Sequence, residues 1–323
     1  MLRNLPVLLG IFVVMALSNA VVPVLPDFGE GAAMQGAVYA AYFLGTFVTV
    51  LPAGMASDRI GRVPFIRAGL LLTFASGVLI LLFPSGLPLI VFRVVEGIGA
   101  GLFLSAAFAW ANSHPSSGRV SGYVVAAQNL GLVVGLLAAG WLDAALNSHL
   151  AGIALFTVLA APALVMGIAV RESERDGFAS VDISPIVRDY FWLFAAAAVL
   201  VGMTGAVAAV YPEYTGQDPS ILMAGAVAAG YVTPYAFPFI GALAGVVIVA
   251  ALAFLAKTRV QQGVMTGLFN SATYAGFTLL PALAGLAAGA FGFLAAFLLL
   301  AGMSAAMAVP VGRCRCAYYH PRL

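Results

Sequence analysis

The chain has 323 residues, of which 63% are apolar and 8% charged, and its mean hydropathy is +1.07. A soluble domain of ordinary composition carries roughly 25% charged residues, so a water-covered globular surface is excluded. The formal net charge of +2 gives no support to a nucleic-acid partner, and the two cysteines, both in the C-terminal tail, exclude a disulfide framework and a four-ligand zinc site. We expect a polytopic protein of the lipid bilayer, without cofactor or metal.

A helix needs about 20 apolar residues to cross a bilayer, and eleven runs with few or no charges reach or approach this length. In chain order they are Leu5–Leu25, Ala33–Met55, Pro64–Phe83, Leu87–Ala111, Val120–Leu142, His149–Val170, Tyr190–Tyr211, Ile221–Tyr235, Phe237–Ala256, Gly263–Ala287 and Gly289–Val311. Continuous apolar runs without two-residue alternation indicate helices and not a membrane barrel. We predict an all-α fold with an N-terminal six-helix bundle at 1–170, a cytoplasmic linker at 171–189, and a shortened C-terminal bundle of about five helices with a cytoplasmic tail at 190–323.

The loop bases predict the orientation, because cationic loops stay cytoplasmic. They alternate correctly over the first seven runs if the N-terminus is cytoplasmic. Lys257 and Arg259 break this rule if both Ile221–Tyr235 and Phe237–Ala256 cross fully. We therefore expect a multi-pass protein of the plasma membrane in which one of these two segments, the short Ile221–Tyr235, does not cross.

The two halves share matching proline and glycine positions. The matches are Pro26 with Pro212, Pro84 and Pro88 with Pro234 and Pro238, and Gly122, Gly131 and Gly140 with Gly267, Gly276 and Gly285. The offset between the halves falls by 36 residues after the seventh run, which is about one helix with its loop. We predict a parallel repeat whose second copy has lost the counterpart of Ala33–Met55.

The second apolar run ends in the pattern Gly-x-x-x-Asp-Arg-x-Gly-Arg. Its members are Gly54, Asp58, Arg59, Gly61 and Arg62. The pattern resembles the loop between the second and third helices of the major facilitator superfamily, although Val63 stands where a third base is usual. The resemblance implies two bundles and a gating role for Asp58, Arg59 and Arg62. The alternative interpretation is a tight turn whose bases only fix the orientation.

Arg93 and Glu96 lie inside the fourth apolar run, three residues apart on one helical face. An ionisable residue at membrane depth indicates function by default. An Arg followed by a glycine-rich run also resembles the fourth-helix motif of this superfamily. That resemblance implies proton-coupled transport, in which Arg93 modulates the protonation of Glu96 or binds an anionic group. The alternative is a hydrated pair at the outer interface, because Pro84 and Pro88 place the helix start nearby.

Glycines in the fifth and tenth runs resemble the antiporter motif of the same superfamily. The residues in question are Gly122, Gly131, Gly135 and Gly140, with Gly276 and Pro281 in the second half. Leu136 and Leu280 depart from that motif. Close packing through small residues, with no role in coupling, is the alternative.

Polar residues within membrane helices face protein or water and not lipid. The uncharged candidates for a substrate cavity are Asn19, Gln128, Asn129 and Asn270, with Tyr39, Tyr42 and Tyr274 as aromatic walls. Each of them also suits a simple helix-to-helix hydrogen bond.

We expect a secondary active transporter that exports a small molecule against protons by alternating access. An enzyme is disfavoured, because no Ser/His, paired Asp or His-x-x-x-His arrangement occurs in an apolar run, and no ATP-binding loop is present. The rival from another class is a transport-defective shortened homologue, which acts as an interaction partner or has no function.

Overall fold

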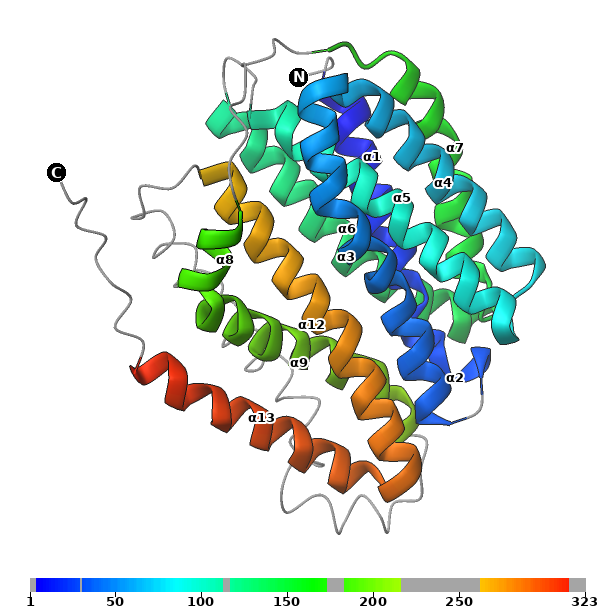
Figure 1. Cartoon of the computed structure of the whole chain (residues 1–323). Helices are drawn as coiled ribbons and strands as arrows, with labels where there is room; N and C mark the ends of the chain where they lie inside the picture. Colours follow the sequence, from blue (N-terminus) through cyan, green and yellow to red (C-terminus); the bar gives the residue numbers. More distant parts are fainter. Residues whose placement is uncertain (1–3, 30, 113–116, 173–182, 216–261, 314–323) are drawn as a thin grey trace, which may run out of the picture. The chain divides into compact units, whose positions relative to one another are not determined.

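The computed structural model describes residues 4–29, 31–112, 117–172, 183–215 and 262–313 (Figure 1). Every element assigned in these ranges is helical. They are α1 (Leu5–Ala20), η2 (Val22–Val24), α2 (Leu25–Phe28), α3 (Ala32–Ile60), α4 (Arg62–Leu82), α5 (Gly86–Asn112), α6 (Ser117–Leu146), α7 (Ala151–Ile168), α8 (Ser184–Asp189), α9 (Phe191–Thr215), α12 (Gln262–Phe291) and α13 (Phe293–Arg313).

Eight of the helical segments within the described residues are long and apolar enough to cross a membrane, and α13 contains a shorter apolar helix, Phe293–Met307. The predicted all-α, polytopic fold is confirmed. The predicted runs Ile221–Tyr235 and Phe237–Ala256, together with Lys257 and Arg259, lie outside the described residues.

The chain divides into two compact units. The N-terminal unit comprises Met1–Glu30 and Ala37–Ala179, and the C-terminal unit comprises Gly31–Gly36 and Ser180–Leu323. Of the expected linker 171–189, residues 173–182 lie outside the described ranges, and the short helix α8 occupies its end.

Helix α1 is the central element of the N-terminal unit. It packs against α6 and α7 and also contacts α4 and α5, while α4 lies along α5 and α7 (Figure 1). The most apolar part of α1 is 72% buried, whereas that of α6 is 22% buried. Helix α1 therefore contributes mainly to the core of this unit, and α6 contributes less.

In the C-terminal unit, α9 packs along α12, and α13 contacts both. The core between them consists of small and medium-sized side chains, among them Ala206, Val210, Leu280, Ala284 and Leu300. Such small side chains let helix backbones approach closely in a membrane.

Two glycines with positive φ separate consecutive helices. Gly61, with φ of 120°, is the single residue between α3 and α4, and Gly292, with φ of 87°, separates α12 from α13. The predicted break between the last two runs, at residue 288, is wrong, because α12 continues to Phe291. Glycine adopts positive φ without a steric penalty, so the helix ends where that conformation is available.

Candidate functional site

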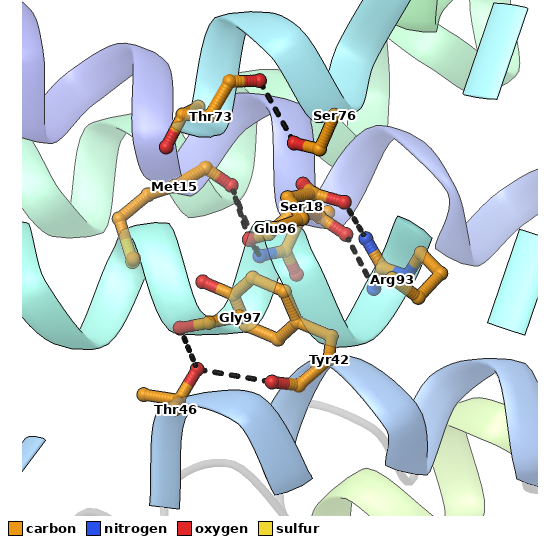
Figure 2. A network of polar contacts seen from close by, with 10 residues as sticks. Met15, Ser18, Tyr42, Thr46, Thr73, Ser76, Arg93, Glu96 and Gly97 are labelled. Carbon is orange, nitrogen blue, oxygen red and sulfur yellow. Dashed lines mark hydrogen bonds and ion pairs between the residues drawn. The ribbon is translucent and has the colours of Figure 1, made fainter. Parts of the chain in front are cut away.

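Arg93 and Glu96 form an ion pair in the interior of α5. Nη1 of Arg93 lies 2.6 Å from Oε2 of Glu96, and each side chain is 1% exposed (Figure 2). Spacing of three residues places them on the same face of one helix. The pair is thus enclosed by protein, and its depth in the membrane stays a prediction.

Neighbouring helices of the N-terminal unit complete the surroundings of Arg93. Its Nη2 donates to the carbonyl oxygen of Ser18 on α1 at 3.4 Å, and the guanidinium carbon lies 4.8 Å from the ring centroid of Tyr42 on α3. The second distance is typical of a cation–π contact. Nε of Arg93 and Oε1 of Glu96 are buried and have no hydrogen-bond partner in the described part of the chain. The hydrogen-bonding capacity of the pair is therefore only partly used by the described residues.

The glycines after Glu96 set the distance between α5 and its neighbours. A methyl group added at Gly97 would overlap the carbonyl oxygen of Tyr42 on α3. One added at Gly99 would lie 3.0 Å from the carbonyl oxygen of Gly69 on α4. Thr46 on α3 donates to the carbonyl oxygen of Gly97 at 3.1 Å across the same contact. The glycine-rich run thus holds α3 and α4 against opposite sides of the helix that carries the pair.

The predicted gating residues do not form a loop. Gly54, Asp58 and Arg59 lie in the last turns of α3, and Arg62 already belongs to α4. The correction follows from Gly61, whose positive φ reverses the chain within one residue. Oδ1 of Asp58 lies 3.6 Å from Nη2 of Arg62. The structure therefore brings Asp58 and Arg62 together.

Glu172, which follows α7, is the partner of this turn that the sequence analysis missed. Its Oε1 accepts the backbone N–H of Arg62 at 2.9 Å, and its Oε2 accepts that of Val63 at 3.2 Å. The sequence separation of 110 residues leaves no local pattern that could have predicted these bonds.

The predicted cavity residues are distributed over both units. Tyr39 and Tyr42 are buried on α3, and Asn19 donates to the carbonyl oxygen of Met15 at 3.1 Å and to Oγ of Ser18 at 3.1 Å. Asn19 and Tyr42 are therefore close to the ion pair, since Ser18 and Tyr42 both contact Arg93.

Four further residues of the predicted cavity lie on α6 and α12. Gln128 is half-buried, and Asn129 is exposed and donates to the carbonyl oxygen of Val125 on its own helix at 2.9 Å. Asn270 and Tyr274 are half-buried on α12 in the C-terminal unit. A cavity shared by all seven residues stays a prediction.

The predicted packing glycines differ in their surroundings. Methyl groups at Gly131 and Gly135 would overlap the carbonyl oxygens of Phe12 and Ala16 on α1, and one at Gly276 would overlap that of Ala198 on α9. One at Gly140 would lie at an ordinary distance of 3.5 Å from Pro23, and one at Gly122 would meet nothing within 4 Å. Pro281 lies inside α12. Three of the glycines thus lie at tight helix crossings, and their role in antiport stays a prediction.

Comparison with known proteins adds family information to this geometry. The sequence model of the Major Facilitator Superfamily matches residues 7–257. The Multidrug resistance protein B homolog of Mycobacterium tuberculosis is 32% identical over 119 residues, covering 36% of this chain and 22% of that protein. The Probable anion transporter 6, chloroplastic, of Arabidopsis thaliana is 31% identical over 127 residues, covering 38% and 25%. The chain thus matches only about a quarter of the length of these relatives.

Solved structures share the fold. The human organic anion transporter MFSD10 has a TM-score of 0.64 at 15% identity, with 94% of this chain and 97% of that chain covered. A mutant of the nucleoside transporter NupG has a TM-score of 0.66 at 12% identity, with 95% and 98% covered.

Proposed function

The chain belongs to the Major Facilitator Superfamily, and on this premise we propose that it is a secondary active transporter that exports a small molecule in exchange for protons. It works by alternating access in the plasma membrane, with its N-terminus and the Gly61 turn on the cytoplasmic side. The buried Arg93–Glu96 pair is the observation that carries the proton coupling.

The energetics of the pair explain how a proton would drive a conformational change. With Glu96 ionised, the two buried charges compensate each other. A proton on the Glu96 carboxylate leaves the Arg93 charge without its counterion, and loss of one partner of a buried pair costs about 3–5 kcal/mol. Protonation therefore favours a second conformation in which water reaches Arg93, and deprotonation returns the transporter to the first.

The drug-resistance relatives support an export direction and a substrate class of drug-like small molecules. In the second conformation, the aromatic ring of Tyr42 and the amide of Asn19 would be available to such compounds beside Arg93. Aromatic walls with a few polar groups are typical of sites for small organic ligands.

The turn at Gly61 supplies the gate in this proposal. Asp58 and Arg62 are partly and fully buried, with 28% and 5% of their side chains exposed. A charge contact between the end of α3 and the start of α4 is an element with two arrangements, made or broken, which is what a conformational cycle requires.

We expect Asp58→Asn to reduce transport per molecule several-fold while protein abundance falls little. The substitution removes the charge that faces Arg62 and keeps the size of the side chain. Quantitative immunoblotting and flux in the same vesicles measure the two quantities. Asp189→Asn is the matched control, because Asp189 is an exposed acid whose contact with Arg188 contributes little. Equal losses of protein and flux in Asp58→Asn would show that this residue only supports the turn.

Flux in inside-out membrane vesicles tests the proposed function directly. The vesicles contain the full chain, and the probes are ethidium, a cationic dye, and carboxyfluorescein, an anionic dye. We expect an imposed pH gradient, acidic inside, to drive accumulation of at least one dye, and collapse of the gradient by an ionophore to stop it. A chain that moves neither dye at any gradient would contradict export and would favour a shortened homologue without transport.

A further inference from the structure

The first turn of α4 has an unusual way of satisfying its backbone donors. The N–H of Gly61 donates to the carbonyl oxygen of Ser57 at 3.0 Å, and Pro64 has no N–H. Only the N–H groups of Arg62 and Val63 therefore need an acceptor, and Gly61 has no side chain to provide one. The two carboxylate oxygens of Glu172 accept one bond each. A negative group at this position also suits the positive end of the helix dipole.

The last turn of α7 is capped in the opposite sense. Arg67, on the second turn of α4, donates through Nη2 to the carbonyl oxygen of Ile168 at 2.6 Å and to that of Val170 at 3.4 Å. Its Nε donates to the carbonyl oxygen of Gly167 at 3.3 Å. The final carbonyls of a helix lack partners within the helix, and a cation there suits the negative end of the dipole. Arg67 of α4 therefore caps the end of α7, and Glu172, which follows α7, caps the start of α4.

The chain segment that leaves α7 is also held from a third side. Nε1 of Trp110, near the end of α5, donates to the carbonyl oxygen of Arg171 at 3.2 Å. The segment that precedes Glu172 is therefore held by Arg67 and by Trp110. All of these groups belong to the N-terminal unit.

We propose that Arg67 and Glu172 are positioning residues that join the gating turn at Gly61 to the exit of α7, so that the turn and the segment leading out of this unit move as one piece. Arg67 fixes the exit of α7, this exit presents Glu172, and Glu172 fixes the first turn of α4. The gating role of the turn rests on the proposed function, whereas the mechanical coupling does not.

Hydrogen–deuterium exchange of the full chain in lipid nanodiscs, read by mass spectrometry, tests the coupling without any transport assay. Glu172→Gln leaves one acceptor oxygen for two donors, so we expect exchange at the amides of Arg62 and Val63 to rise about tenfold. Arg67→Gln is the decisive variant, because Arg67 does not touch these two amides. We expect it to raise their exchange as well as that of residues 167–172.

Two exposed residues provide matched controls. Arg119→Gln removes a base and Asp189→Asn removes an acid, and neither should change exchange at Arg62 and Val63. If Arg67→Gln accelerates exchange only in residues 167–172 and leaves the α4 amides protected, the coupling is absent and the proposal fails.

A charge exchange distinguishes reciprocal caps from an ordinary ion pair. In the double variant Arg67→Glu with Glu172→Arg, a simple salt bridge would be re-formed. The two helix caps would not be re-formed, because an Arg at position 172 would face the N–H donors of α4 and a Glu at position 67 would face the carbonyl oxygens of α7. We expect the double variant to exchange at least as fast as either single variant. Restored protection would overturn the proposal.

Discussion

Glu96→Gln is expected to make dye flux independent of pH while a slow, gradient-insensitive leak remains. Gln has nearly the same shape as Glu and cannot take up a proton, so the site would hold one charge state through the whole cycle. Both side chains are buried, so in this conformation water does not solvate the Arg93 charge when Glu96 loses its own charge. Flux of ethidium in vesicles at several internal pH values measures the effect, and a pH profile unchanged from the parent chain would falsify the assignment of Glu96.

Arg93 provides a companion test of the same pair. Arg93→Met leaves the carboxylate of Glu96 buried without a counterion, so we expect low abundance of folded protein. Arg93→Met combined with Glu96→Met removes both charges and should recover abundance but not pH dependence, since replacement of a complete buried pair by apolar residues is often tolerated. Recovery of pH dependence in the double variant would place the proton site elsewhere.

The sequence predicts the helices and the ion pair because both depend on local properties. Apolar runs near 20 residues identify a membrane helix, and a spacing of three residues places Arg93 and Glu96 on one face. The same local information underlies the expectation of a turn after Asp58. This local information does not predict that the single residue Gly61 makes the turn. The positive φ of Gly61 depends on how the two flanking helices pack in the fold, and the sequence pattern does not contain that information.

The partners of the site could not be predicted, because they come from distant parts of the chain. Ser18 and Tyr42 reach Arg93 from other helices, and Glu172 reaches the Gly61 turn from the segment after α7. Hydropathy predicts that α1, α3 and α5 are membrane-spanning helices, but it does not predict which helices pack against each other. The three closely spaced glycines Gly97, Gly99 and Gly101 indicate close helix packing, but they do not identify the helix that approaches each glycine.

Gly97→Ala is expected to destabilise the N-terminal unit more than any other single-methyl addition near the ion pair. The added Cβ would overlap the carbonyl oxygen of Tyr42, which is backbone of α3 and cannot rotate away as a side chain could. Overpacking of this kind costs about 1–3 kcal/mol. Helix propensity acts in the other direction, because Ala is better than Gly by about 1 kcal/mol inside a helix. The steric term outweighs it, since α3 must shift as a whole and would take Tyr42 and Thr46 away from α5.

Gly122→Ala is the matched control, because a methyl group there meets nothing within 4 Å. The same gain in helix propensity then acts alone, and we expect unchanged or slightly higher stability. Thermal unfolding of the purified chains in one detergent, followed by intrinsic tryptophan fluorescence, compares the two variants. A melting temperature several degrees lower for Gly97→Ala, with no decrease for Gly122→Ala, is the expected result. If both variants melt like the parent, α3 and α5 are not in close contact at Gly97. Arg93 would then lack the aromatic ring of Tyr42 on which the proposed arrangement of the proton site depends.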